Sequence, residues 1–410
     1  MTPQLSPSEL EAGVPRQGLR LTGRVAIDGS EVELTDAYTS VPINWDGEAT
    51  LGDLLIVAGD YDGSHFCVRE ICYRQSGGGA ASIPNNAAHG INSEVARFTT
   101  AGVGRRLRAR DLALRSIRQY FRDEAFVEVQ TPVRVPSPGV EVYVEAIPSG
   151  DSYLITSPEL HMKRLLVGGL PKIYQVAHAS RADEQGAQHE PEFCLIEWYR
   201  AFAGQEHVMV DTEALVRRVA QATIEPPDAD SLRIVSDGRQ IELNAPFDRL
   251  TVSDAFANWA DTPDVVALAA ENEDRYFELF VERIEPRLTE LRRPTFLTEY
   301  PVSQASLARA IPDRPDFAER FELYIGGVEL CNGFGELTCP REQRSRMEAD
   351  NVARVTQGKA PYPVDERFLG ALAEGMPPSG GNALGFDRLL ALCLGADDIQ
   401  SVCAFPNNWR

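Results

Sequence analysis

The fold is decided by the stretch Phe321-Glu322-Leu323-Tyr324-Ile325-Gly326-Gly327-Val328-Glu329-Leu330-Cys331-Asn332-Gly333-Phe334-Gly335-Glu336. Hydrophobic and polar residues alternate on both sides of Gly326-Gly327, which is typical of two strands joined by a two-residue hairpin turn. With that turn, Tyr324 lies opposite Glu329 and Glu322 lies opposite Cys331, so these four side chains are predicted to share one face. The apolar side chains of the other face are predicted to pack in the core.

The two carboxylates on this face point to a cation. Glu322 and Glu329 repel each other when they stand side by side, unless a positive charge lies between them. Paired carboxylates suit Mg²⁺, which prefers oxygen ligands. The alternative is a half-exposed hairpin whose glutamates are simply solvated.

A second stretch, Pro191-Glu192-Phe193-Cys194-Leu195-Ile196-Glu197-Trp198-Tyr199, shows the same alternation. It places Phe193, Glu197 and Tyr199 on one face of a strand, with Cys194, Ile196 and Trp198 on the other. An aromatic ring beside a carboxylate and a phenol is suited to holding a base and a cation.

The composition is that of a globular protein. With 410 residues, 43% of them hydrophobic, the chain is long enough for one small and one large domain. The net charge of −21, with lysine only at Lys163, Lys172 and Lys359, argues against a broad phosphate-binding surface. The seven cysteines form no CxxC pair, so reduced thiols are expected and structural zinc is not. No apolar run reaches about 18 residues and no signal peptide is visible, so a cytoplasmic protein without membrane contact is expected.

The N-terminal part is predicted to be a small all-β domain, residues 1–75. Five strands are expected, separated by turn residues: Leu19–Ile27, Glu31–Leu34, Val41–Asn44, Leu54–Val57 and Cys67–Cys72. This pattern is compatible with an OB-type barrel. The first 100 residues hold six arginines, no lysine and thirteen acidic residues, so this domain is not expected to bind a polyanion.

A Gly-rich stretch, residues 76–103, is predicted to be a linker, and residues 104–410 a second domain. It opens with an arginine-rich helix from Gly104 to Asp123, either a basic patch or an ordinary solvated face. Further elements are expected at Leu154–Thr156 (strand), Pro158–Val167 (helix), Lys172–His178 and Phe193–Arg200 (strands) and Asp254–Leu291 (mostly helical). No Gly-rich phosphate loop is found, so any ATP is not held by a P-loop.

Several separated segments resemble the class II aminoacyl-tRNA synthetases. Phe126 to Pro132 resembles motif 1, Arg181-Ala182-Asp183 with His189-Glu190-Pro191-Glu192-Phe193 resembles motif 2, and Gly385-Phe386-Asp387-Arg388 resembles motif 3. The segments Ser157 to Gly169, Glu197 to Arg200 and Ser303 to Ala308 are similar to lysyl-tRNA synthetase paralogues, the elongation factor P lysine ligases. The implied fold class is α+β, a class II synthetase-like antiparallel sheet flanked by helices and preceded by the OB-like barrel. The family also implies a homodimer.

The resemblance implies an ATP site. Arg181 should hold the α-phosphate, Arg388 the γ-phosphate, and Glu322 and Glu329 the Mg²⁺ ions that bridge the phosphates. Phe193 should stack on adenine. Asp183 and His189 of motif 2 belong to the same ATP site.

It also implies a site for an amino acid. Glu159 and Asn332 should meet its α-amino and carboxylate groups, while Glu197, Tyr199 and Glu336 should enclose a side-chain ammonium. Two glutamates around one cation select lysine-like diamino acids. Cys331 stands where the synthetases usually have glycine and the ligases usually alanine, and it is predicted to reshape the pocket in favour of a related substrate such as (R)-β-lysine.

Motif 2 departs from the family pattern at three positions. Asp183 replaces a glutamate, Ala187 replaces a loop arginine, and Glu190 replaces an asparagine. These changes predict a raised KM for ATP.

The predicted function is ATP-dependent activation of lysine or a lysine-like diamino acid, and its transfer to a lysine side chain of elongation factor P. Charging of tRNA as a lysyl-tRNA synthetase is the main alternative. A catalytically impaired binding protein that keeps the fold is the other, although retention of Arg181, Glu322, Glu329 and Arg388 argues against it.

Overall fold

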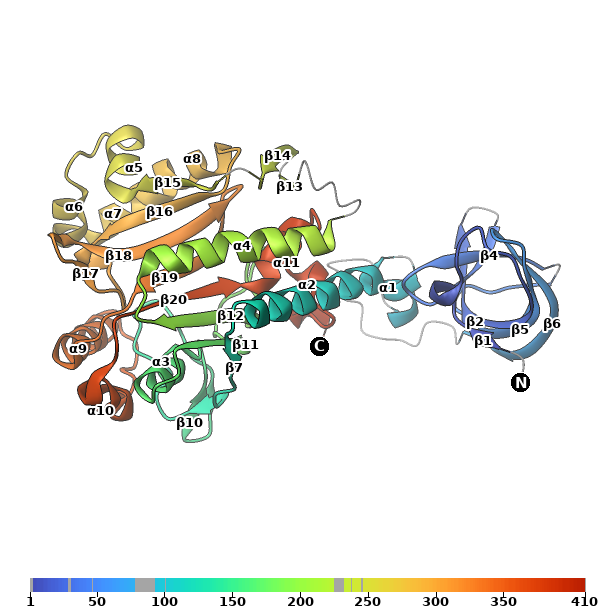
Figure 1. Cartoon of the computed structure of the whole chain (residues 1–410), viewed down its shortest axis with the longest axis horizontal. Helices are drawn as coiled ribbons and strands as arrows, with labels where there is room; N and C mark the ends of the chain where they lie inside the picture. The colour runs from blue at the N-terminus through green and yellow to red at the C-terminus, as the bar shows by residue number, and fades with distance from the viewer. Residues whose placement is uncertain are drawn as a thin grey trace. The chain divides into compact units, whose positions relative to one another are not determined.

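The computed structural model describes residues 3–28, 31–45, 47–77, 93–99, 101–224, 232–236, 238–244 and 246–409. They form two compact units, one made of the residues up to Asp111 and those from Ser401 onward, the other running from Leu112 to Gln400 (Figure 1). The predicted linker, residues 76–103, lies for its greater part outside the described residues. Within it, Glu94–Thr99 forms the short helix α1.

The first unit contains a closed sheet. Its strands are β1 (Gln4–Leu5), β2 (Arg16–Asp28), β3 (Glu31–Thr35), β4 (Ser40–Asn44), β5 (Leu54–Tyr61) and β6 (Phe66–Gln75). The order is β1-β2-β3-β4-β6-β5, and β5 also pairs with β2, which closes β2 to β6 into a barrel. Leu21, Leu34, Leu55, Val57 and Phe66 fill its interior. All five predicted strands are present, and the arrangement is compatible with an OB-like barrel.

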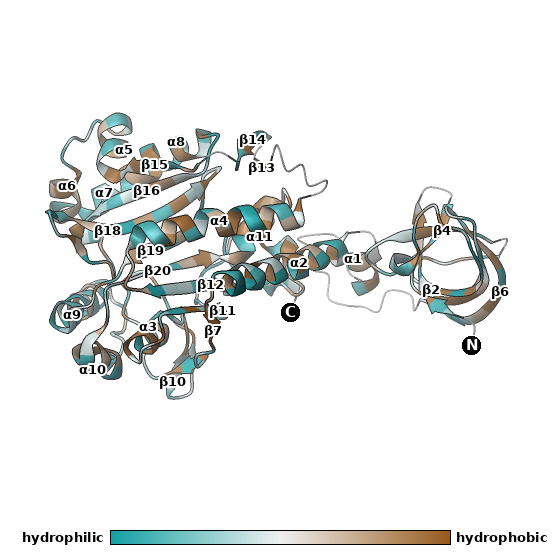
Figure 2. Ribbon diagram, viewed as in Figure 1, coloured by the Kyte–Doolittle hydropathy of each residue, from teal (hydrophilic) through white to brown (hydrophobic). Residues whose placement is uncertain are grey.

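The arginine-rich helix is α2, Val103–Asp123, which confirms the predicted element. Its apolar side is deeply buried at Ala113, Ile117 and Phe121, and Figure 2 shows hydrophobic and hydrophilic residues alternating along it. Arg106 donates to the carbonyl of Ser401 at 2.7 Å, within the first unit. Part of the arginine side therefore binds the chain itself and is not a free phosphate-binding surface.

The second unit is built on a nine-stranded sheet with the order β15-β16-β18-β19-β20-β12-β11-β7, in which β17 pairs with β18. The strands are β7 (Val127–Glu128), β11 (Lys172–Ser180), β12 (Glu192–Ala201), β15 (Asp248–Thr251), β16 (Thr295–Pro301), β17 (Ala310–Ile311), β18 (Arg314–Ile325), β19 (Val328–Gly335) and β20 (Ser379–Gly385). The pairs from β16 to β11 are antiparallel, as the fold class predicts. Two small sheets lie beside it: β8 (Arg134–Val135), β9 (Pro148–Ser149) and β10 (Ser152–Leu154), and β13 (Arg233–Ser236) with β14 (Arg239–Glu242).

Helices cover both faces of this sheet. The long α4 (Gln205–Thr223) and α11 (Phe386–Cys393) pack on one face, where Asn382 of β20 donates to the Thr212 hydroxyl at 2.8 Å. On the other face, α3 (Glu159–Val167) packs with α9 (Pro340–Thr356) and α10 (Glu366–Gly375). The predicted helix Pro158–Val167 is confirmed to within one residue, whereas the predicted strand Leu154–Thr156 is found two residues earlier, as β10.

The predicted helical stretch between Asp254 and Leu291 is confirmed. It consists of α5 (Val252–Trp259), α6 (Val265–Glu271), α7 (Glu273–Leu279), a π-helical turn (Phe280–Ile284) and α8 (Glu285–Glu290). Their buried side chains form a core with Leu297, Tyr300 and Tyr324 of the sheet. Short 3₁₀ turns occur at Pro7–Glu9, Val302–Gln304, Gln400–Val402 and Asn407–Trp409.

The hairpin of β18 and β19 corrects the predicted register. Gly326 and Gly327 form the expected turn, with φ of +60° and +83°, and Tyr324 pairs with Glu329 as predicted. A β-bulge follows, so Cys331 pairs with Leu323 and not with Glu322. The prediction that Cys331 shares a face with Glu322 is therefore wrong, because the extra residue shifts the alternation by one.

Candidate active site

A cavity of about 180 Å³ lies where the motif 2 loop, β12, β19 and the β20–α11 junction meet. Six of the predicted site residues line it: Arg181, His189, Phe193, Glu329, Asn332 and Arg388. Cys331 also borders it, but its side chain belongs to the other face of the sheet. The segments that resemble motifs 2 and 3, which lie about 200 residues apart, are thus brought together.

The Arg181 guanidinium lies over an aromatic ring, and one of its N–H donors is not used within the described residues. Its guanidinium carbon is 5.1 Å from the centre of the Phe193 ring, and one terminal nitrogen is 3.5 Å from Glu184. Its Nε is buried and has no hydrogen-bond partner among the described residues. A buried donor without an acceptor is costly, so the site is prepared for an acceptor that a ligand supplies.

Arg388 is fixed from three sides. It donates to the carbonyls of Gln188 and Glu329 at 3.1 and 2.8 Å, and it lies 2.8 Å from His189 Nε2. Burial and the Arg388 charge lower the pKa of His189, which favours the neutral imidazole. The preceding residue, Asp387, accepts the backbone N–H of Cys194 at 2.7 Å and ties α11 to β12.

The motif 2 loop is anchored by contacts that the sequence did not reveal. Asp183 adopts a φ of +63° and does not line the cavity, whereas Glu184 does. The Gln400 amide donates to Gly186, His189 and Glu190, and the Ile399 N–H donates to the Ala187 carbonyl. Ile399 and Gln400 therefore anchor the motif 2 loop around Ala187, the position where the family usually has an arginine.

Glu322 lies in a second, adjoining cavity and is already engaged by its neighbours. One of its oxygens accepts a hydrogen bond from Arg320 at 2.7 Å, and the other accepts from the hydroxyls of Tyr300 and Tyr324 at 2.6 and 2.7 Å. Arg320 also donates to Asn332. Sequence reasoning missed Arg320, although it stands two residues before Glu322 and so on the same face of β18.

The carboxylates of Glu329 and Glu322 fit a magnesium ion that a nucleotide brings into the site. Glu329 is 42% exposed at the cavity, while Glu322 keeps its hydrogen bonds. Over the described ranges, no three His, Cys, Asp or Glu side chains form a metal-binding group. Magnesium is commonly held by one or two carboxylates together with substrate phosphates, and these residues match that pattern.

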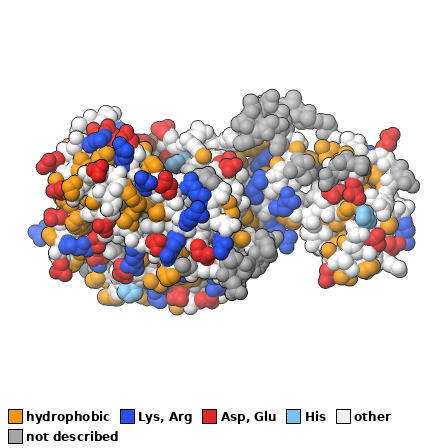
Figure 3. Space-filling view, turned by 90° about the horizontal axis from the view of Figure 1, so that it is seen from above, with side chains coloured by type: hydrophobic (Ala, Val, Ile, Leu, Met, Phe, Trp, Pro, Cys, Tyr) orange, Lys and Arg blue, Asp and Glu red, His pale blue; other side chains and the backbone are white. Residues whose placement is uncertain are grey.

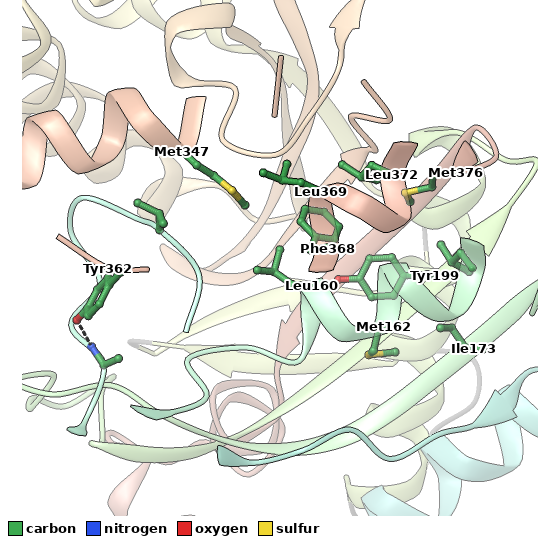
Figure 4. Close-up of a cluster of buried hydrophobic side chains, with 13 residues drawn as sticks. Leu160, Met162, Ile173, Tyr199, Met347, Tyr362, Phe368, Leu369, Leu372 and Met376 are labelled. Carbon is green, nitrogen blue, oxygen red and sulfur yellow. Dashed lines mark hydrogen bonds between the residues drawn. The ribbon is translucent and has the colours of Figure 1, made fainter. Parts of the chain in front are cut away.

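The residues predicted to enclose an ammonium are buried below the cavity. Glu197 has no exposed surface, and it accepts hydrogen bonds from Ser157 at 2.7 Å and from the Tyr199 hydroxyl at 3.0 Å. Burial and the nearby Glu159 charge raise the pKa of Glu197 to about 8. The Tyr199 ring packs among Leu160, Met162, Ile173 and Phe368 (Figure 4).

Lys163 completes this group and was missed by the sequence reasoning. Its ammonium lies 2.5 Å from Glu159 and 2.5 Å from Glu336. Burial opposes the charge, but the two carboxylates outweigh it and raise the pKa of Lys163. The group closes around Gly381, where an added Cβ would lie 2.3 Å from the Tyr199 ring and 2.4 Å from a Glu336 oxygen.

The predicted role of Cys331 at the substrate is not supported by its position. It pairs with Leu323 and Leu384, and its thiol lies near Asn382, on the face of the sheet covered by α4. The neighbouring residue on the face of the sheet that borders the cavity is Ala383 of β20. It pairs with both Asn332 and Glu197 and lines the cavity. Sequence reasoning missed Ala383 because a lone alanine carries no chemical signal.

A family model described as tRNA synthetases class II (D, K and N) matches residues 90–409. The chain belongs to this family. The elongation factor P (R)-β-lysine ligase of Proteus mirabilis is 37% identical over 336 residues, covering 77% of this chain and 98% of that protein. The ligase of the same name from Vibrio cholerae is 36% identical, covering 73% and 94%. The lysine–tRNA ligase of Gloeobacter violaceus is 35% identical, covering 74% of this chain and 64% of that protein.

These relatives confirm the resemblance to the elongation factor P lysine ligases. Membership of the class II synthetase family implies an ATP-dependent ligase, in agreement with the arginine-lined cavity between motifs 2 and 3. No helix in the described part of this class II synthetase is both long and apolar enough to cross a membrane.

Proposed function

We propose that this protein activates a lysine-like diamino acid with ATP and transfers it to a lysine side chain of elongation factor P. The observation that carries the proposal is the group of carboxylates next to a cavity with two arginines: Glu197 and Glu336 are fully buried, and Glu159 is 16% exposed. Carboxylates in this setting select a substrate with an extra ammonium group. The relatives named (R)-β-lysine ligases support (R)-β-lysine as the first substrate to test.

In the first step the amino-acid carboxylate attacks the α-phosphate of ATP, giving an aminoacyl-adenylate and pyrophosphate. The protein must neutralise charge and align two reactants, and no protein nucleophile is required. Arg181 supplies its unpaired Nε–H to the α-phosphate, and Arg388 meets the γ-phosphate. Phe193 offers a flat surface for adenine. Magnesium, held with the help of Glu329 and Glu322, would neutralise phosphate charge.

The amino acid is recognised by charge. Glu197 has hydrogen-bond partners but no ion-pair partner among the described residues, so its carboxyl group is available to a substrate ammonium, which favours the ionised form. Glu159 and Asn332 are assigned to the amino and carboxylate end, and His189 and Asp183 to the ATP side. Glu336 and Tyr199 complete the group around Glu197.

Elongation factor P is the proposed acceptor in place of tRNA. This chain covers 98% of the Proteus mirabilis protein ligase but only 64% of the Gloeobacter violaceus tRNA ligase. Its first 100 residues carry thirteen acidic side chains and six arginines, which suits an RNA-binding barrel poorly. A homodimer and a cytoplasmic location remain part of the proposal by family resemblance.

One experiment separates the two acceptors. Labelled lysine or (R)-β-lysine is incubated with ATP, Mg²⁺, elongation factor P and total tRNA, and the product is then exposed to mild base. An amide on the protein survives this treatment and an ester on RNA does not. Label that stays on elongation factor P supports the proposal, whereas base-labile label on RNA would establish a tRNA synthetase instead.

A further inference from the structure

A second cavity, of about 400 Å³, adjoins the ATP cavity. The two share Glu141, Glu329 and Asn332 in their linings, so they meet at the edge of the proposed reaction centre. Its walls come from the segment around Tyr143, from α7 and the π-helical turn, and from β18. Nothing in the proposed activation step uses its outer part.

The charge of this acidic cavity is strongly one-sided. Its lining contains six carboxylates and a single guanidinium: Glu141, Glu273, Glu285, Glu322, Glu329 and Asp350, against Arg320. That guanidinium is already paired with Glu322 at 2.7 Å. A phosphate is therefore repelled from the outer part, and a cationic group is attracted.

An independent feature also points to a ligand. The side chain of Tyr276 lines the cavity and is only 2% exposed, yet its hydroxyl has no hydrogen-bond partner within the described ranges. The ring is fixed by stacking on Phe256 at 5.0 Å. A buried phenol without a partner is uncommon, and a ligand with hydrogen-bonding groups would satisfy it.

The mouth of the cavity is apolar with an acidic border. Tyr143, Phe277 and Val281 are 55%, 37% and 58% exposed, and the two rings meet edge to face at 5.8 Å. They continue into a surface depression that also contains Asp274, Glu278 and Glu282. Figure 3 views the α5–α8 side of the molecule, where hydrophobic side chains lie exposed among charged ones. Such a border matches a basic protein surface.

We propose that the acidic cavity receives the lysine side chain of the acceptor protein and leads it to the adenylate. This inference rests on the proposed function. The aromatic walls at Tyr276, Phe277 and Phe280 suit the methylene groups of lysine, while the carboxylates suit its ammonium. The residues proposed to select the side-chain ammonium of the amino acid, Glu197, Tyr199 and Glu336, do not line this cavity, so the two lysine-like groups are received by different side chains.

The transfer step balances without a further reactant. The ammonium loses one proton, the resulting amine attacks the adenylate carbonyl carbon, a C–N bond forms, and the bond to the AMP oxygen breaks. A second proton leaves the nitrogen as the amide forms. The carboxylates that line the cavity are the groups proposed to accept these protons.

The test compares the two half-reactions in a variant of the outer wall. Glu273→Gln with Glu285→Gln removes two exposed carboxylates of the cavity that lie outside the proposed ATP and amino-acid sites. The matched control is Glu271→Gln with Glu374→Gln, two exposed glutamates that do not line it. Pyrophosphate exchange measures adenylate formation, and labelling of purified elongation factor P measures transfer.

The cavity variant should keep wild-type exchange while kcat/KM for elongation factor P falls by about tenfold, and the control should change neither. The charge-reversed pair Glu273→Lys with Glu285→Lys should lower transfer further. If the cavity variants label elongation factor P as fast as the wild type, the inference is wrong but the proposed function stands. The same holds if the variants lose exchange and transfer equally. A wild-type protein that exchanges pyrophosphate but labels no elongation factor P overturns the proposed function, and this inference with it.

Discussion

The ammonium of Lys163 lies 2.5 Å from a carboxylate oxygen of Glu336, and neither side chain has any exposed surface. The same ammonium is 2.5 Å from Glu159. Two of the three carboxylates around the proposed substrate pocket thus have a resident counter-charge, and Glu197 does not. This distribution leaves room for one further ammonium, which is what a diamino acid brings beyond its α-amino group.

Replacing Lys163 with methionine should destabilise the protein by about 3–5 kcal/mol, because Glu336 is left buried without its partner. Urea unfolding measures the change. Lys172→Met, which removes a surface lysine, serves as the control. Adding Glu336→Gln to Lys163→Met should recover much of the loss, and equal stability of the two lysine variants would show that the buried pair contributes nothing.

Binding of the diamino acid at pH 7 should release a proton from Glu197. Its pKa of about 8 keeps it largely protonated in the free protein, and a substrate ammonium favours the carboxylate. Calorimetry of lysine binding in buffers of different ionisation enthalpy counts the proton. Glu197→Gln should abolish the release and weaken binding, and an unchanged proton count in that variant would assign the proton to another group.

The same pKa predicts how stability depends on pH. The folded-state pKa of Glu197 is above its ordinary value of 4.5, so the unfolded chain ionises first as the pH rises. Stability therefore falls between about pH 4.5 and pH 8, and the full penalty is present above pH 8. Glu197→Gln should be more stable relative to the wild type at pH 8 than at pH 5 in urea unfolding.

Arg181→Lys should lower the rate of pyrophosphate exchange by about a hundredfold. A lysine places its charge near the α-phosphate but cannot reproduce the fixed guanidinium over Phe193 or its Nε donor. Arg314→Lys, at a half-exposed pair with Glu299, is the control. Exchange within a few-fold of the wild type would mean that Arg181 has a structural role.

The motif 2 loop allows a test of the raised KM for ATP. Gln400 donates to Gly186, His189 and Glu190 and holds the loop where a family arginine is replaced by Ala187. Gln400→Ala should therefore raise the KM for ATP several-fold and change kcat little. Ala187→Arg should lower the KM, and a KM that responds to neither change would remove the loop from ATP binding.

The alternation of residue types was enough to predict the strands but not their register. Leu330, the extra residue of the bulge, is apolar and only 1% exposed, as an inward-facing residue of a regular strand would be, so nothing in the local pattern marks it. Lys163 illustrates a second limit, because a lysine in a helix is usually solvated and its burial depends on Glu336, 173 positions away. The position of Arg320 could have been predicted, because it stands two residues before Glu322 and alternate residues of a strand share one face.

On the corrected register we expect Ala383, and not Cys331, to influence the choice between α-lysine and β-lysine. Ala383 pairs with Asn332 and Glu197 and lines the cavity, whereas the Cys331 thiol faces Asn382 under the sheet. Changing Ala383 to glycine alters the space between the residues assigned to the two ends of the substrate. It should therefore change the ratio of α-lysine to (R)-β-lysine activation by about tenfold, measured by pyrophosphate exchange. Cys331→Gly should leave that ratio unchanged, and a shift caused by Cys331→Gly alone would restore the original hypothesis.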